Sequence, residues 1–343
     1  MSTAWSVREL EPSEFTSWNA LVAAASEGSP YQTPEYLRAL ATAAGADWRL
    51  LGVYRAGELW GGIGLYEEAG RFGLQASSRL LLYYNGPVIR ATPGQPSASE
   101  DKHRRDALAH LADYLGDGPY RLLRVKTRAQ QLDFRPWLER GWSARPVYTY
   151  VVDTRDATET WRNIDHNLQR LVRRAEYHGI TVTEHGDIGA FLAMHRQTHE
   201  RKGAPIYLAD PQFRQFIESL VADNRARLFQ ASLPDGPPVA AQLVIFSDHP
   251  VTHTVAAAAD AEHQHLGSNA LLRWRVFQWL ATKGYQANDL TDAHQPQVAR
   301  FKAQLGGRVE MGLQLELRNA HWTRLRQRLK QVAKQLKNGR LSS

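Results

Sequence analysis

The sequence predicts an α/β protein with mixed sheets, built from two copies of one unit and followed by a basic amphipathic helix. The main observation is an internal repeat, in which a helix precedes a β-hairpin at an offset of about 177 residues. In the first copy a helical pattern begins at Pro34 and an apolar strand at Arg49. In the second copy the same patterns begin at Pro211 and Arg227.

Length and composition fit two such units. The chain has 343 residues, of which 43% are hydrophobic, enough for two domains with cores of their own. We expect domains over residues 1–150 and 151–317, and the helical tail over 318–343. No apolar run approaches the roughly 18 residues of a membrane span. The first residues show no basic segment followed by an apolar block, so we expect no secretory leader. The absence of cysteine excludes disulfides and cysteine nucleophiles, and fits a cytoplasmic protein.

The elements of the first unit follow from local patterns. Gly57 predicts the turn of the hairpin, and Gly61 and Gly62 allow another backbone to approach its second strand. Beyond the hairpin, residues 94–100 are typical of a loop, rich in Pro, Ser and Gly. We then expect a helix over 106–115 and strands over 120–126 and 147–152.

The second unit begins with one long helix over residues 160–178, ended by Gly179. Gly236 predicts the turn of its hairpin, and Gly284 ends its last long helix. The other expected elements are a strand over 180–183, helices over 188–201, 211–224 and 269–283, a loop over 202–210, and a strand over 311–317.

The positive charge is concentrated in the tail. The net charge is +7, but residues 318–343 contain eight basic residues and no acidic one, so the rest of the chain is nearly neutral. The tail also carries an apolar stripe at helical spacing: Trp322, Leu325, Leu329, Val332 and Leu336. Such a helix can pack on the protein body, contact an anionic membrane at its inner face as a peripheral protein, or bind tRNA phosphates.

Three motifs then stand out. Residues 83–88 read Tyr-Tyr-Asn-Gly-Pro-Val, and residues 167–175 read Asn-Leu-Gln-Arg-Leu-Val-Arg-Arg-Ala and lead to Gly-Ile-Thr-Val at 179–182. Residues 300–307 read Arg-Phe-Lys-Ala-Gln-Leu-Gly-Gly, after an Asp289-Leu290 pair. Together these motifs resemble the signature segments of the Fem-type aminoacyltransferases, which build peptidoglycan bridges. The resemblance covers nearly the whole chain, and the Phe-Lys-Gly-Gly element is its most specific part.

The resemblance implies two GNAT-like acyltransferase domains in tandem, which would explain the repeat. It implies an aminoacyl-tRNA donor, an amine acceptor on a peptidoglycan precursor stem peptide, and no cofactor. The chain departs from the family in the helix after Gln32 and Thr33, where Tyr36 replaces a tryptophan and Leu40 replaces a lysine that helps to hold a nucleotide diphosphate. It also lacks a long coiled-coil insertion. The identity of the acceptor does not follow from the resemblance.

Two other functions compete with this one. An acyl-CoA-dependent N-acyltransferase acting on a sugar or small amine needs a glycine-rich loop that binds pyrophosphate at a helix N-terminus. The corresponding segment, residues 264–270, keeps Gly267 but has Asn269 where Gly or Ala is needed, so we expect no acetyl-CoA binding. The third alternative is a GNAT-like binding module without catalytic activity, which the intact Phe301-Lys302 element argues against.

The expected catalytic residues lie near the Phe-Lys element. Lys302 matches the family's lysine and would stabilise the oxyanion formed during transfer, although without the motif it would be interpreted as a solvated lysine near a strand start. Asp289 and Asp292 would orient the acceptor amine or take its proton, or else serve as turn or cap residues. Phe301 and Tyr84 are expected to bind substrate.

Basic residues supply the remaining expected contacts. Arg170 and Arg174 lie on one helix face and could bind phosphates, or they could form an ordinary solvated charged surface. Arg201 and Lys202, which we expect in a loop, could bind a phosphate. The i, i+4 pair formed by His195 and His199 has no further ligands at metal-binding spacing, so no metal is expected.

Overall fold

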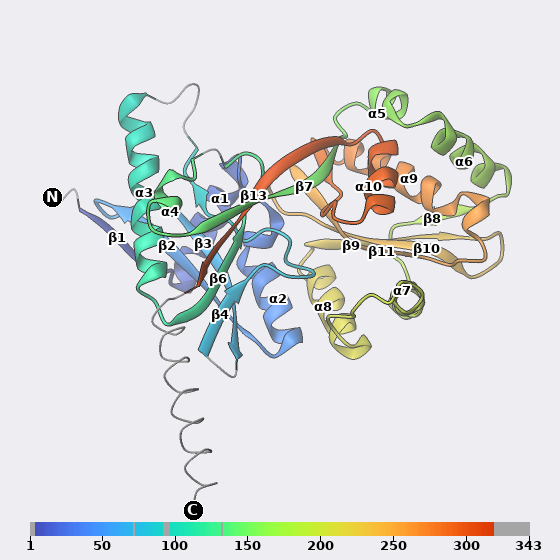
Figure 1. The fold of residues 1–343 in the computed structure, drawn as a ribbon. Coiled ribbons are helices and arrows are strands. Elements are labelled where there is room, and N and C mark those ends of the chain that lie inside the picture. The colour runs from blue at the N-terminus through green and yellow to red at the C-terminus, as the bar shows by residue number, and fades with distance from the viewer. Residues whose placement is uncertain (1–3, 71–72, 92–96, 132, 319–343) are drawn as a thin grey trace, which may run out of the picture.

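One large mixed sheet runs through the whole molecule (Figure 1). The computed structural model describes residues 4–70, 73–91, 97–131 and 133–318, with nothing described of the Lys202 side chain. The predicted tail helix therefore lies outside the described residues, apart from Arg318. Within the described part, 13 strands form the sheet in the order β1-β2-β3-β4-β6-β13-β7-β12-β11-β10-β9-β8, and β5 pairs with β3. No helix of this part is long and apolar enough to cross a membrane.

The N-terminal half of the sheet is covered by helices on both faces, and its strands bury Leu51, Ile63 and Leu123 against α3. The predicted helix over 106–115 begins earlier than expected, because Ser97 and Glu100 form a capping box at its N-terminus. The elements of this half are β1 (Trp5–Glu9), α1 (Phe15–Ala24), α2 (Pro34–Ala44), β2 (Asp47–Arg55), β3 (Glu58–Gly70), β4 (Gly73–Ser77), β5 (Val88–Ile89), α3 (Ala98–Gly116), β6 (Tyr120–Lys126) and α4 (Arg135–Leu138).

The C-terminal half repeats this plan. Helix α9 packs Leu272, Val276 and Leu280 against the sheet. The elements are β7 (Ser143–Asp153), α5 (Ala157–Asn163), α6 (His166–Tyr177), β8 (Thr181–Thr183), α7 (Ile188–Lys202), α8 (Asp210–Ala222), β9 (Ala226–Ser232), β10 (Pro238–Ile245), β11 (Val251–Ala259), α9 (Ser268–Thr282), β12 (Ala287–Asp289), α10 (Pro296–Gln304) and β13 (Arg308–Arg318).

The two copies of the repeat meet face to face. Helices α2 and α8 occupy corresponding places before the hairpins β2–β3 and β9–β10, and they pack against each other. Tyr36 of α2 meets Phe216 of α8 edge to face, with ring centroids 5.6 Å apart. Both rings are fully buried in a hydrophobic cluster that draws residues from both halves. The repeats therefore share a core.

The last strand also joins the halves. β13 pairs with β7 from Arg308 opposite Val151 to Glu316 opposite Ser143. The end of β13 pairs with β6, as Figure 1 shows where the red strand crosses to the N-terminal half. β7 itself spans residue 150, so the domain boundary we predict there falls inside a strand.

Two local expectations were wrong. The helix over 160–178 is two helices, because Ile164 is extended and the Asp165 side chain caps α6 by accepting from the Asn167 N–H. Arg318 ends β13 instead of beginning the tail helix.

Candidate functional site

The site forms where two parallel strands separate. β11 and β12 pair over three residues, the last pair being His253 with Asp289. β12 ends there, whereas β11 continues to Ala259 with no partner strand on that edge among the described residues. An unpaired strand edge presents backbone N–H and C=O groups to whatever lies beside it.

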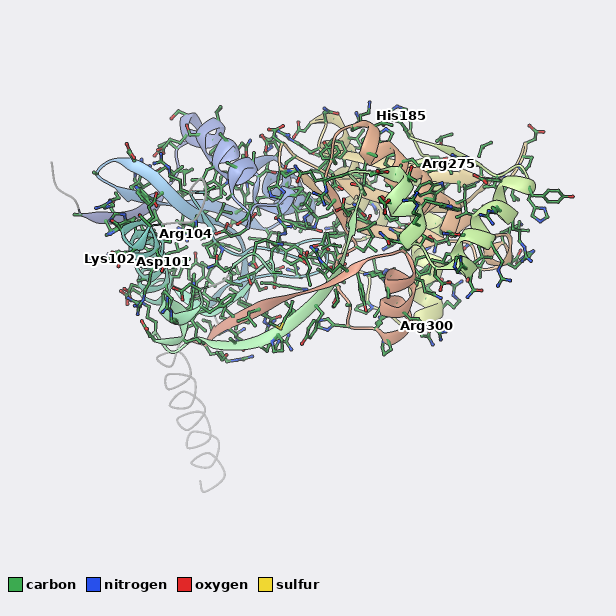
Figure 2. The ribbon with its side chains drawn as sticks, turned by 90° about the horizontal axis from the view of Figure 1, so that it is seen from above. Asp101, Lys102, Arg104, His185, Arg275 and Arg300 are labelled. Carbon is green, nitrogen blue, oxygen red and sulfur yellow. The ribbon has the colours of Figure 1, made fainter. Side chains whose placement is uncertain are left out.

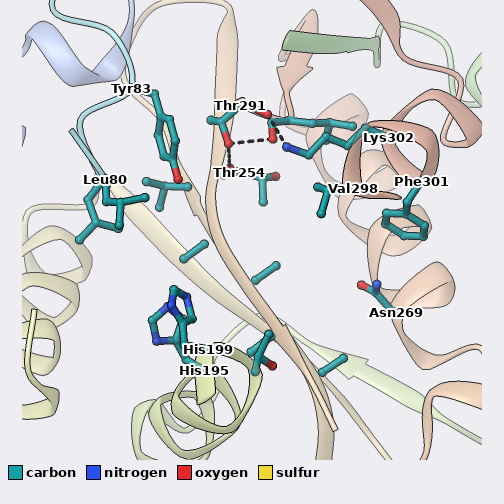
Figure 3. Close-up of a pocket in the computed structure, with 18 of the residues that line it drawn as sticks. Leu80, Tyr83, His195, His199, Thr254, Asn269, Thr291, Val298, Phe301 and Lys302 are labelled. Carbon is teal, nitrogen blue, oxygen red and sulfur yellow. Dashed lines mark hydrogen bonds between the residues drawn. The ribbon is translucent and has the colours of Figure 1, made fainter. Parts of the chain in front are cut away.

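A cavity of about 420 Å³ lies along this edge (Figure 3). Its floor includes the small side chains from Ala256 to Ala259 of β11. α7, α9 and α10 provide walls, and the N-terminal half contributes Leu80, Leu81 and Tyr83. Both halves of the molecule therefore build the cavity, and its volume suits a small-molecule or chain-end ligand.

The charged groups of the lining are all basic. Arg201, Arg273 and Lys302 line the cavity, and no Asp or Glu does so among the described residues. His195 and His199 face the cavity from α7. Burial lowers the pKa of His195 to about 4, with His199 adding to the shift, so His195 is neutral at pH 7. Nδ1 of His199 lies 3.0 Å from the carbonyl oxygen of Pro205.

Lys302 is held in place by backbone carbonyls. Its Nζ donates to the carbonyl oxygen of Thr291 (Figure 3) and to that of Asp292, which uses two of the three ammonium donors and leaves one without a described acceptor. The pKa of Lys302 is lowered to about 8, mainly by burial, with Arg273 adding to the shift and the two nearby aspartates opposing it. The ammonium is a positioned cation at the cavity wall.

The carbonyls that hold Lys302 belong to an unusual turn. Thr291 has a φ of 55° and Asp292 a φ of 26°, in the left-handed region that a β-branched residue such as Thr rarely enters. The turn is fixed by Thr291, whose N–H donates to Asp289 Oδ1 and whose hydroxyl donates to the Thr254 carbonyl. Strain of this kind often marks a functional position.

A buried polar layer lies beneath this turn. Asp289 is 1% exposed, its Oδ1 accepts from the Thr149 hydroxyl at 2.6 Å, and burial raises its pKa. His253 is fully buried, with Nδ1 3.7 Å from Asp289 Oδ2, and neither of its nitrogens has a hydrogen bond within the described structure. Tyr31 and Tyr84 pack edge to face on His253. The layer joins both halves directly under the cavity.

The predicted site residues are distributed over three places. Lys302, Phe301 and Arg201 line the cavity. Asp289 and Tyr84 are buried in the layer below it, and the Asp292 carboxylate faces away toward His294, whose N–H it accepts. Arg170 and Arg174 lie on α6 and do not line the cavity, although Arg174 donates to the carbonyl of His265. The side chain of Lys202 is outside the described structure.

Several cavity residues had no predicted role. Arg273, one turn after Asn269 on α9, is 92% buried and has no ion pair or hydrogen bond to any described residue. The i, i+4 spacing of Asn269 and Arg273, which places two polar side chains on one face of α9, was the available signal. Lys126, which does not line the cavity, also had no predicted role: it is 8% exposed, and its Nζ lies 5.7 Å from the ring centre of Tyr84.

The loop before α9 has a packing role. Gly267 has a φ of 85°, and a Cβ there would lie 2.2 Å from the carbonyl oxygen of Leu171. A glycine is therefore required at this position whatever the loop binds. Asn269 lines the cavity beside the α9 N-terminus, where the sequence suggested that it would crowd a phosphate (Figure 3).

Comparison with known proteins agrees with this geometry. Residues 159–303 match the acetyltransferase (GNAT) domain family. The whole fold is similar to the crystal structure of FemX, with a TM-score of 0.70 and 12% identity over 90% of this chain and 96% of that chain. This chain has the tandem GNAT fold. The Fem-type resemblance is thus confirmed for the fold, and the family match supports an acyltransferase.

Other proteins with the tandem GNAT fold are similar at comparable identity. L-PGS from Bacillus licheniformis is 14% identical, with a TM-score of 0.56 over 91% of this chain and 93% of that one. A tandem GNAT protein from the clavulanic acid biosynthesis pathway is 13% identical, with a TM-score of 0.52 over 92% of this chain and 98% of that one. No curated protein is significantly similar in sequence.

Proposed function

We propose that this tandem GNAT protein transfers an aminoacyl group from aminoacyl-tRNA to an amine acceptor, which we expect on a peptidoglycan precursor stem peptide. The observation that carries the proposal is the Lys302 ammonium, fixed by two carbonyls at the wall of a cavity whose described lining contains no acidic side chain. The fold likeness to FemX supports the same reaction class.

The proposed step is an ester aminolysis. The neutral amine attacks the ester carbonyl carbon, so that a C–N bond forms and the carbonyl oxygen becomes an oxyanion. The free donor of Lys302 stabilises that oxyanion, a contribution that is typically worth about 10²–10³ in rate. The C–O bond to the ribose then breaks, the ribose oxygen takes up a proton, and the attacking nitrogen loses one.

Asp289 has a positioning role in this proposal. Its carboxyl group holds the Thr291 turn, and that turn orients Lys302. Asp289 is too deeply buried to reach a substrate in the cavity, and Asp292 is not among the residues that line it. We therefore assign neither aspartate to proton transfer, although both were expected there. Phe301 and Arg201 remain as proposed substrate contacts.

In this proposal the acceptor is not linked to a nucleotide diphosphate. At the position of the family's phosphate-binding lysine, Leu40 is fully buried, and Tyr36 one turn earlier on α2 packs against Phe216. No ligand can reach either side chain without opening the shared core. Peripheral membrane contact by the basic tail, which would bring the enzyme to a lipid-linked acceptor, stays a prediction.

The second candidate is acyl-CoA-dependent N-acylation of a sugar or small amine. The match of residues 159–303 to an acetyltransferase domain favours it, and so does the free edge of β11 in the cavity. Asn269 at the α9 N-terminus argues against it.

One experiment separates the two donors. Purified protein is incubated with radiolabelled aminoacyl-tRNA pools or with radiolabelled acetyl-CoA, each against muropeptide precursors and a panel of amines. We expect label transfer from aminoacyl-tRNA only, and no micromolar acetyl-CoA binding by calorimetry. Saturable acetyl-CoA binding with acetyl transfer would replace the first proposal by the second.

A further inference from the structure

We infer that the cavity binds an oxyanion group of its ligand, a carboxylate or a phosphate, at the guanidinium of Arg273 on α9. The inference deepens the proposed function, on which it rests in treating that ligand as a substrate. It assigns a role to Arg273, which neither the fold nor the sequence motifs suggest.

Arg273 carries a buried charge that nothing in the described structure neutralises. It is 92% buried, and burial lowers its pKa to about 10, so the guanidinium is charged at pH 7. None of its nitrogens has a hydrogen bond or ion pair among the described residues. A buried charge without a partner is costly, and proteins pair such charges or use them for ligands.

The guanidinium is directed to the cavity. Arg273 lines it, and Nε is the only one of its nitrogens that is sealed from solvent without a partner. The terminal nitrogens therefore face open space. These two nitrogens form the planar fork that matches the oxygens of a carboxylate or phosphate.

The surroundings add positive potential from two sides. Arg273 lies in the second turn of α9, whose N-terminus and Asn269 face the same cavity. Lys302 on α10 is a second cation at the cavity wall, and Arg273 contributes to lowering its pKa, as a cation close by would do. The nearest acidic groups, Asp289 and Asp292, do not line the cavity.

Calorimetry of the full chain with three probes tests this inference. Inorganic phosphate, pyrophosphate and acetate are titrated at low ionic strength, since the first two represent a phosphate-bearing ligand and the third a carboxylate. We expect saturable binding of one class, weakened at least tenfold in Arg273→Gln. Arg273→Lys keeps the charge but loses the fork, and should bind with intermediate affinity.

The matched control is Arg275→Gln. Arg275 lies on the same helix (labelled in Figure 2), is exposed, pairs with Glu176 at 3.0 Å and does not line the cavity. It should change the affinity less than threefold. The Arg273→Gln variant should melt at the wild-type temperature or above, because it removes an unpaired buried charge.

Three results would overturn the inference: no saturable binding of any probe, equal weakening in both glutamine variants, or a much lower melting temperature for Arg273→Gln. The last would mean that the guanidinium is structural. Failure of the proposed function is separate, since oxyanion binding that depends on Arg273 would persist in a protein that shows no aminoacyl transfer.

Discussion

The Nζ of Lys302 lies 2.5 Å from the backbone carbonyl oxygen of Asp292, a residue with positive φ. The same ammonium donates to the carbonyl of Thr291, which also has positive φ. The strained turn after β12 therefore positions the ammonium group of Lys302 in α10. The predictions below test this arrangement.

The pH dependence of transfer should report the pKa of Lys302. Burial lowers that pKa from 10.5 to about 8, and only the ammonium can stabilise an oxyanion, so kcat should fall as the pH rises above about 8. Lys302→Arg keeps its charge throughout and should show lower activity without this alkaline fall. The measurement is kcat from pH 6 to 10 for both proteins. An identical alkaline fall in the arginine variant would assign it to another group.

The same shift has a consequence for stability. Because the folded state holds the Lys302 proton less tightly than the unfolded state, burial of the ammonium costs stability in full below about pH 8. That cost is relieved as the pH rises from about 8 to 10.5.

Asp289 variants distinguish a positioning role from proton transfer. Asp289→Ala leaves the Thr149 hydroxyl and the Thr291 N–H without their acceptor, and should lower the free energy of unfolding by about 1–3 kcal/mol. Asp289→Asn keeps an acceptor and should retain most of the kcat.

The stability of the asparagine variant also has a predicted sign. Since burial raises the pKa of Asp289, the folded protein loses stability as the pH rises through that pKa and the buried carboxyl group ionises. The Asp289→Asn variant has no such group and should not show this loss. Chemical denaturation at pH 4 and pH 7, alongside kcat, checks both points. A kcat as low in Asp289→Asn as in Asp289→Ala would favour a direct role in proton transfer.

The shared core predicts that both halves unfold together. Phe216→Ala removes a fully buried ring that packs on Tyr36 of the other repeat, and should cost about 3–5 kcal/mol. Guanidinium denaturation followed by tryptophan fluorescence and circular dichroism should give one transition, with its midpoint at a lower guanidinium concentration than in the wild-type protein.

The control at the same interface is Arg38→Ala. Arg38 pairs with Asp223 at 2.9 Å but is largely exposed, so its loss should cost less than about 1 kcal/mol. Two transitions, with only one moved by Phe216→Ala, would show that the halves fold independently.

The sequence predicted the repeat well, because hairpins and amphipathic helices are local patterns. It could not show that α2 packs on α8 or that β13 joins β6, since these contacts link residues far apart in the chain. The break at Ile164 was missed because its cause includes a tertiary contact, the Asp165 N–H donating to the Gln304 carbonyl. The residues at which helices and strands end depend on such tertiary contacts as much as on helix and strand propensity.

The site was predicted in part for the same reason. The Phe-Lys motif identified Lys302 and Phe301, both of which line the cavity. Arg273 has no motif, and only the folded structure shows that it is buried without a partner. Asp289 stood out as a carboxylate at a strand end, but its depth below the cavity depends on how β7 and β11 enclose it.

The central claim is that Lys302 stabilises the transition state, and steady-state kinetics of Lys302→Ala with aminoacyl-tRNA and the acceptor test it most directly. Arg300→Ala is the matched control, since Arg300 is exposed on the same helix (labelled in Figure 2). We expect kcat to fall by about 10²-fold or more in Lys302→Ala, with a small change in acceptor KM and in melting temperature, and near wild-type kinetics in Arg300→Ala. An unchanged kcat with a raised KM, or a fall in kcat matched by a large loss of stability, would contradict the claim.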